Sequence, residues 1–164
     1  MSVACRPPAE CGPEEIRAFA RLLDGAFGAS DRSARIGRAV ALVFLKAGSE
    51  LAGVAAIKTP DSRHRREMFA RAGVALPGPP PRHELGWVVV DGGHRGRGCS
   101  RLLVQAALQA AGHLDLFATS HTGNHPMHRT LERLGFTRVG HPWFSRRHQR
   151  ELALFLRTAA PRAG

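Results

Sequence analysis

A glycine- and arginine-rich segment near the middle of the chain has residue types that can bind an anion. Arg95-Gly96-Arg97-Gly98 follows the apolar, β-branched run Leu85–Val90 and precedes a helical repeat of apolar residues that begins at Cys99. This order predicts a strand, a tight turn and a helix N-terminus. The first-turn N–H groups and the helix dipole favour negative charge, glycines let a ligand approach the backbone, and arginines donate charge-assisted hydrogen bonds. We therefore expect an anion site at residues 95–101.

Two common phosphate-binding motifs do not fit this segment. A Walker loop requires a Gly-Lys pair, and the chain contains none. A dinucleotide-binding fingerprint requires a third glycine where this chain has Arg101. Without a further signal, a solvated turn between strand and helix is the alternative interpretation.

Two motifs together resemble one enzyme family. Arg95-x-x-Gly98-x-Ser100 resembles the pyrophosphate loop of the GNAT superfamily of acyl-CoA N-acyltransferases, Gln/Arg-x-x-Gly-x-Gly/Ala, with serine at the last position. Further along, Asn124 opens a predicted helix that ends in Leu-Glu-Arg-Leu-Gly-Phe, residues 131–136. This is similar to the family's Tyr-Glu-x-Leu-Gly-Phe, with Leu131 in place of the tyrosine. The resemblance is strongest over residues 84–136.

The resemblance implies acetyl-CoA as co-substrate and no metal. It implies that the pantetheine arm binds the backbone of one strand, the pyrophosphate binds the glycine-rich loop, and an asparagine contacts the pantetheine or holds the strands apart. The cofactor residues that follow are Val88, Val89, Val90, Arg95, Gly96, Arg97, Gly98, Cys99, Ser100, Arg101 and Asn124.

The implied reaction is direct transfer of an acetyl group from acetyl-CoA to a primary amine. A lysine-like amine has a pKa near 10.4, so its deprotonation at pH 7 costs about 4.6 kcal/mol. The resemblance assigns the general base to a carboxylate near the head of the central strand, where Glu84 stands. A strand-end residue that only bonds its neighbours is the alternative for Glu84.

The general acid is the weakest part of the pattern, because the chain contains no tyrosine. A positioned acid contributes about 10²–10⁴ in rate, yet a thiolate is a tolerable leaving group. We expect Ser120 and His128 to share the catalytic site with Glu84, and His121 and His125 are further candidates. The three histidines have no carboxylate or cysteine to complete a metal site, which favours solvated or capping roles. Cys99 is either a reactive thiol or a small residue packed under the loop.

The elements that position these residues predict an α+β, three-layer fold. We expect a GNAT-like mixed, mostly antiparallel twisted sheet of six to seven strands, flanked by about four helices, with a splayed parallel pair at the centre. The parallel partner of Leu114–Thr119 is expected to be Leu85–Val90. We expect one domain over residues 1–158, a flexible tail over 159–164, and an insertion over 60–83 that is either functional or mobile surface.

Composition narrows the functional classes. The net charge is +11 over 164 residues, but arginine dominates and only two lysines, Lys46 and Lys58, occur, as a GC-rich genome would produce. Few aromatic residues accompany the charge, so no nucleic-acid stacking platform is visible. Three cysteines without metal-like spacing, no secretory signal and no run of about 18 apolar residues predict a cytoplasmic protein that does not cross a membrane.

The expected partners are acetyl-CoA and an amine acceptor, with neither nucleic acid nor a membrane and with a homodimer left open. The acceptor classes that stay open are a small amine, an antibiotic, a peptide N-terminus and a protein lysine. Basic segments at Arg63–Arg66 and Arg146–Arg150 are expected to flank the acceptor and favour an acidic one. The alternative functions are an acyl-CoA-binding module without turnover and, less favoured, a nucleic-acid-binding domain.

Overall fold

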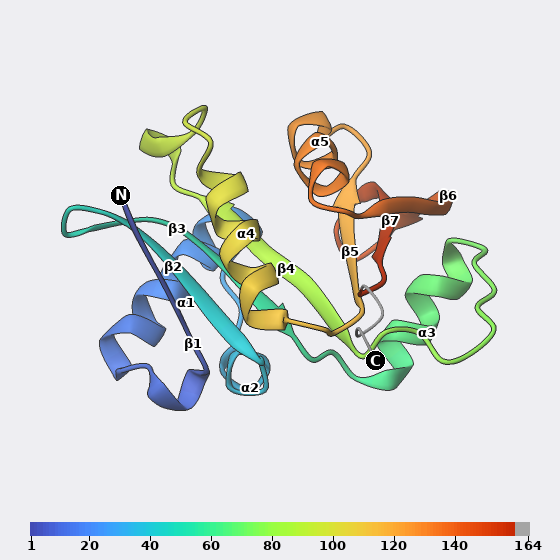
Figure 1. Ribbon diagram of the computed structural model, residues 1–164, viewed down its shortest axis with the longest axis horizontal. Helices are drawn as coiled ribbons and strands as arrows, with labels where there is room; N and C mark the ends of the chain where they lie inside the picture. The colour runs from blue at the N-terminus through green and yellow to red at the C-terminus, as the bar shows by residue number, and fades with distance from the viewer. Residues whose placement is uncertain (160–164) are drawn as a thin grey trace. The chain divides into compact units, whose positions relative to one another are not determined.

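The computed structural model describes residues 1–159 and shows a seven-stranded sheet flanked by helices (Figure 1). The strand order is β1-β2-β3-β4-β5-β7-β6. The expected α+β class and mixed sheet are confirmed, with five α-helices rather than about four. The bounds are β1 Ser2–Arg6, α1 Pro13–Phe27, α2 Ser33–Gly37, β2 Ala41–Ala47, β3 Glu50–Lys58, α3 Ser62–Arg71, β4 His83–Val90, α4 Cys99–Ala111, β5 Leu116–His121, α5 His125–Arg133, β6 Thr137–Ser145 and β7 Arg150–Arg157.

The parallel pair lies at the centre of the strand order and joins the two strands expected, but the paired residues of β4 come just before Leu85. β4 pairs with β5 through His83 opposite Leu116 and Glu84 opposite Phe117. The predicted partner, Leu85–Val90, is the part of β4 that follows this pairing. The apolar run marks the strand only from Leu85, because His83 and Glu84 are polar and follow the proline-rich segment 77–81 closely.

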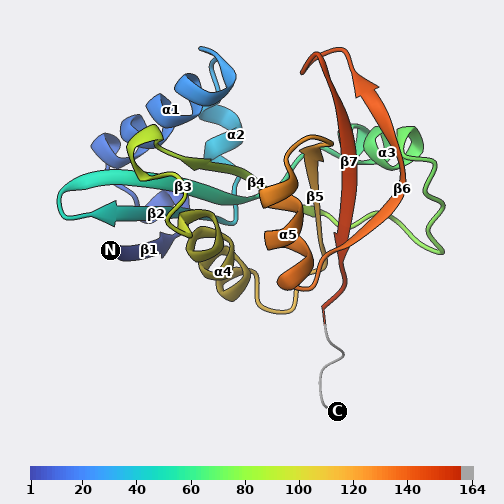
Figure 2. The ribbon, with the colours of Figure 1, turned by 90° about the horizontal axis from the view of Figure 1, so that it is seen from above.

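The chain divides into two compact units, and the boundary runs through β4. Unit 1 comprises Met1–Thr59 and Leu85–Gly112, and unit 2 comprises Pro60–Glu84 and the residues from His113 onward. Within unit 1, α1 and α2 cover one face of β1–β4 and α4 covers the other (Figure 2). The α1 face is filled by a core cluster that includes Phe19, Leu23 and Phe44. The expectation of one domain over 1–158 stays a prediction.

In unit 2, the insertion between β3 and β4 is part of the core. α3 and α5 lie on opposite faces of β5–β7 (Figure 2). The ring of Phe69 in α3 meets that of Phe117 in β5 at 5.6 Å, and both belong to a buried cluster with Trp143. Arg65 donates to the carbonyl of Pro80 at 3.4 Å and so ties the proline-rich arm to α3. The helix of the insertion is therefore a structural layer rather than mobile surface.

Local signals place most helix ends. Asp61 caps α3, its Oδ1 accepting from His64 N at 2.8 Å. α4 spans the predicted Cys99–Ala111, and Asn124 caps α5.

Of the predicted tail, only Ala159 lies within the described residues, and its N–H donates to Asp115 Oδ1 at 2.8 Å. Among the described residues, no helix is both long and apolar enough to cross a membrane.

Candidate acyl-CoA site

The anion loop predicted from sequence lies in unit 1 and joins β4 to α4. Gly96 and Gly98 have φ values of +74° and +76°, a left-handed conformation that glycine adopts without strain. A β-carbon built on either glycine would meet nothing within 4 Å, so this side of the loop is open. The first intrahelical bond runs from Leu102 N to Gly98 O, and the N–H groups of residues 99–101 lie ahead of it. The loop therefore offers first-turn amides to a ligand that can approach closely.

Side chains around the loop divide into a buried anchor and exposed charges. Cys99 is 2% exposed, and its thiol donates to the carbonyl of His94 at 3.4 Å. This placement fits the packed alternative for Cys99 rather than a reactive thiol. Arg95, Arg97 and Arg101 are all exposed. The loop thus combines a fixed backbone with three guanidinium groups at the surface.

The last residues of β4 present backbone groups at the strand edge away from β3. Asp91 N donates to Ala52 O of β3 at 2.9 Å, and a β-carbon on Gly53 would lie 2.9 Å from Val89 O. Backbone groups of successive strand residues alternate in direction, so those of Val88 and Val90 point away from β3. The Val90 carbonyl accepts from Arg95 Nε at 3.4 Å.

Trp87 is a feature of β4 that sequence reasoning missed. Its φ is +53°, which is rare for a bulky residue and costs on the order of 1–3 kcal/mol that the surrounding contacts must offset. The ring packs edge-on to Phe19 with centroids 6.1 Å apart, and Lys58 Nζ lies 4.8 Å from its centroid. These contacts hold a strained residue directly before Val88. A tryptophan in a β-branched strand was visible in the sequence, but its backbone angle was not.

Glu84 and Ser120, two predicted catalytic residues, lie in unit 2 on neighbouring strands. Glu84 is 5% exposed and aligns with Phe117, while Ser120 is 8% exposed and aligns with Ala153 of β7. Side chains alternate between faces along a strand, so Glu84 shares the face of Phe117 and α3, and Ser120 faces α5. The two side chains thus emerge on opposite faces of the sheet.

His128, the third predicted catalytic residue, is buried in α5 with 8% exposure. Its Nε2 lies 3.0 Å from the carbonyl of His121, and its ring is 5.0 Å from that of Phe155. A carbonyl only accepts, so Nε2 carries the proton. Burial, the largest cause, lowers the pKa of His128 below its usual value of 6.5, against the raising effect of the bond to His121. The expectation of a solvated or capping histidine is wrong for this residue, because it is packed on β7.

The remaining motif residues lie at the two ends of α5. Asn124 caps the helix, with Oδ1 accepting from Met127 N at 3.4 Å, so its side-chain amide is left to donate. Leu131, at the position of the family's tyrosine, is 1% exposed. His125 stands 6.0 Å from the ring of His128 and is exposed. Among the described residues, no group of three or more His, Cys, Asp and Glu is placed to hold a metal ion.

The family model for the acetyltransferase (GNAT) family matches residues 11–136, well over half of the chain. The chain belongs to this family. The match includes β4, the anion loop and α5, the elements that carry the two GNAT motifs read from the sequence.

Solved GNAT-like structures share the fold at low sequence identity. An acyl-CoA N-acyltransferase from Pseudomonas aeruginosa has a TM-score of 0.68 and 14% identity, with 96% of this chain and 99% of that chain covered. The putative acetyltransferase yncA from Salmonella typhimurium, solved with its cofactor acetyl-CoA, has a TM-score of 0.68 and 15% identity over 100% and 98%. FeeM, an N-acyl amino acid synthase from uncultured soil microbes, reaches 0.72 with 18% identity over 98% and 92%. No curated protein matches the chain in sequence.

Proposed function

We propose that this GNAT protein is an N-acetyltransferase that moves the acetyl group of acetyl-CoA directly to a primary amine. The observation that carries the proposal is the loop at residues 95–101. Its two left-handed glycines leave an open face at the start of α4, and the same segment carries three exposed arginines. A pyrophosphate is the ligand that this combination of amides and guanidinium groups fits.

The proposed cofactor roles follow from the directions of the backbone groups in the loop and at the end of β4. The amides of residues 96–101 bind the pyrophosphate, with Arg95 at the entrance of the loop. The edge groups of Val88 and Val90 pair with the pantetheine as a neighbouring strand would. Asn124, whose carbonyl caps α5, offers its amide N–H groups to the pantetheine. Each charge-assisted hydrogen bond contributes about 1.5–3 kcal/mol, so a few of them support micromolar binding.

In the chemical step, the amine nitrogen attacks the thioester carbonyl, an amide bond forms, and the carbon–sulfur bond breaks. Glu84 accepts the proton that the amine loses, directly or through water. The departing thiolate takes its proton from solvent, because the two candidate side chains, Ser120 and His128, lie on the face of the sheet opposite to Glu84. His128 is the weaker of the two side chains, because its Nε2 proton is engaged by the His121 carbonyl and its pKa is lowered by burial.

A second function competes with catalysis and has one specific observation in its favour. Leu131 is buried where the family carries its acid, and the chain has no tyrosine elsewhere. A protein that binds acyl-CoA as a sensor or partner domain needs no acid. Binding data therefore do not separate the two functions, whereas turnover does.

The acceptor is proposed to be an amine that carries negative charge. Exposed arginines on α3, at residues 146 and 147 of the β6–β7 loop and at Arg150, the first residue of β7, supply a basic surface in unit 2. Arg65 is excluded from this count, because it is committed to the carbonyl of Pro80. Surface charge of this kind attracts acidic ligands without specifying one.

Calorimetric titration with acetyl-CoA followed by a turnover assay tests the proposal. We expect saturable binding, and thiol release that depends on both acetyl-CoA and an amine from a panel of neutral, acidic and peptide amines. Binding without amine-dependent thiol release would favour the sensor function. Absence of acetyl-CoA binding would overturn both.

A further inference from the structure

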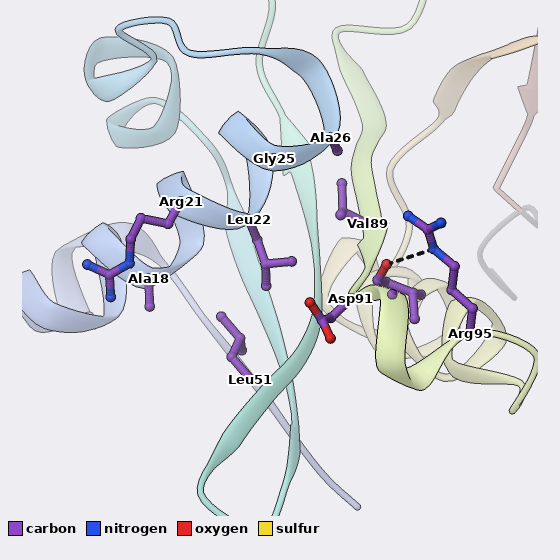
Figure 3. Close-up of a pocket in the computed structure, with 11 residues that line it drawn as sticks. Ala18, Arg21, Leu22, Gly25, Ala26, Leu51, Val89, Asp91 and Arg95 are labelled. Atoms are coloured by element: carbon purple, nitrogen blue, oxygen red, sulfur yellow. Dashed lines mark hydrogen bonds between the residues drawn. The ribbon is translucent and has the colours of Figure 1, made fainter.

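A groove of about 420 Å³ lies in unit 1, on the α1 side of the sheet (Figure 3). Its volume falls within the range of small-molecule sites, about 300–1,000 Å³. The walls come from α1, from the start of β3 and from the end of β4 with the turn that follows. All lining residues belong to this one unit.

The floor of the groove is apolar, and the core on which it packs leaves it partly uncovered. Leu22 and Leu51 pack against the first core cluster but stay partly buried, and Val89 lies beside them. Their side chains face the groove from three different elements (Figure 3). Such a floor suits a short aliphatic ligand, because the ligand would remove the apolar surface of the floor from water.

Three charged side chains stand around this floor, and they are not equally available. The carboxylate of Asp91 accepts from Gly93 N at 3.2 Å and lies 3.6 Å from His94 Nδ1, so the turn engages it. Across residues 1–159 Arg21 has no hydrogen-bonded partner. Its charge acts only weakly on Glu14, which is bound by Arg17.

Arg95 stands on the opposite wall from Arg21 (Figure 3). It donates through Nε to the Val90 carbonyl and keeps its two terminal nitrogens for another acceptor. The two arginines therefore offer unused donors above an apolar floor.

We propose that this groove binds a short aliphatic carboxylate, with the chain on Leu22, Leu51 and Val89 and the carboxylate on Arg21. A cation is disfavoured because both available groups are positive. A neutral aliphatic molecule would leave the arginine donors without an acceptor. The groove shares Val89, Val90 and Arg95 with the proposed acetyl-CoA site, so hexanoate binding is tested without acetyl-CoA and either inference can fail alone.

Hexanoate is the probe, with hexylamine and hexanol as comparators of the same chain length. In methyl-labelled protein without acetyl-CoA, we expect hexanoate to shift the signals of Leu22 and Leu51 saturably. Leu103, buried on the α4 face, serves as the internal reference. Hexylamine should shift nothing, and hexanol should bind more weakly. Equal binding of all three molecules, or no shift at Leu22 and Leu51, overturns the proposal.

Gly25 supplies the steric test with a matched control. A β-carbon at Gly25 of α1 meets nothing within 4 Å, and its φ is not in the left-handed region. Gly25→Trp should therefore fill the groove and abolish the hexanoate shifts, while Gly25→Ala should keep them. Unchanged hexanoate affinity in folded Gly25→Trp would overturn the proposal.

Arg21→Gln provides an independent test if Gly25→Trp does not fold. Removal of one charged donor should weaken hexanoate binding about tenfold and leave the weaker binding of hexanol unchanged. Loss of the same size for hexanol would contradict a carboxylate site. Acetyl-CoA titration of the same variants gives a separate readout, so failure of the groove and failure of the proposed function are distinguishable.

Discussion

Gly140 of β6 lies so close to Ala72 at the end of α3 that a β-carbon on Gly140 would stand 2.2 Å from the Ala72 carbonyl oxygen. The same carbonyl accepts from His141 N at 2.9 Å, and Gly140 has a φ of +67°. Between Val139 and Trp143, β6 has three residues where its partner β7 has only one, Ala153. We call this bulge the clasp, because its contacts with Ala72 hold the inserted α3 to the sheet of unit 2.

Gly140→Ala should destabilise the protein by about 3 kcal/mol, because it adds backbone strain and a clash with the Ala72 carbonyl. Urea unfolding followed by circular dichroism measures the change. Gly78→Ala is the control, since a β-carbon at Gly78 meets nothing and its φ is not left-handed. Equal stability of the two variants would show that the clasp does not hold α3.

His128 should make the folded state less stable as the pH falls below about 6.5. Burial lowers its pKa in the folded state, so the unfolded chain binds the proton more readily. The stability that neutral His128 contributes is therefore complete above the pKa of the unfolded chain. It is lost as the pH falls toward the folded pKa, and the free energy of unfolding changes by no more than about 1.4 kcal/mol per pH unit. Urea unfolding between pH 8 and pH 5 measures this slope.

Two variants separate His128 from other titrating groups. His128→Gln keeps a donor for the His121 carbonyl and removes the titration, so the slope between pH 7 and pH 5 should flatten. His113→Gln, at an exposed histidine of unit 2, should leave the slope unchanged. An identical slope in wild type and His128→Gln would contradict the assignment.

Gly98→Trp should weaken acetyl-CoA binding at least tenfold. The bulky residue cannot adopt φ +76° without strain, and it would cover the open face of the loop. Calorimetric titration measures the affinity. The control is Gly37→Ala in α2, where a β-carbon meets nothing. Unchanged affinity in folded Gly98→Trp would place the cofactor elsewhere.

Glu84→Gln should reduce the turnover number by about 10²–10⁴ with little effect on acetyl-CoA affinity, because it removes the proposed base and keeps the shape of the side chain. The deficit should narrow at high pH, where more of the amine is already deprotonated. Glu132→Gln, at an exposed carboxylate of α5, is the matched control. Equal thiol release by Glu84→Gln and wild type, with a true acceptor, would contradict the base assignment.

Leu131→Tyr should raise turnover, because it restores a hydroxyl at the position where the family carries its acid. Leu131 is 1% exposed, so a larger ring brings about 1–3 kcal/mol of overpacking. Leu131→Phe has the same bulk without the hydroxyl and is the proper reference. We expect thiol release by the tyrosine variant to exceed that of the phenylalanine variant at least tenfold. No difference between them would show that an acid at this position does not limit the rate.

The sequence by itself determined the features that depend on neighbouring residues. Apolar periodicity predicted α4 within its observed bounds, and Asn124 marked the start of α5 through the side-chain cap that it makes. The glycine spacing at residues 96 and 98 predicted the turn, because left-handed backbone there is cheap only for glycine. Each of these signals acts over a few residues, and this is why it can be read from the chain alone.

Only the tertiary structure decided what depends on residues distant in sequence. It placed the parallel pairing at His83 and Glu84, put Glu84 and Ser120 on opposite faces, and buried His128 on β7. The groove beneath Arg21 and the strained angle of Trp87 also depend on packing between separate elements. Register, burial and cavities arise from long-range contacts whose energies no local pattern encodes, so the sequence predicted the cofactor loop more fully than the groups around it.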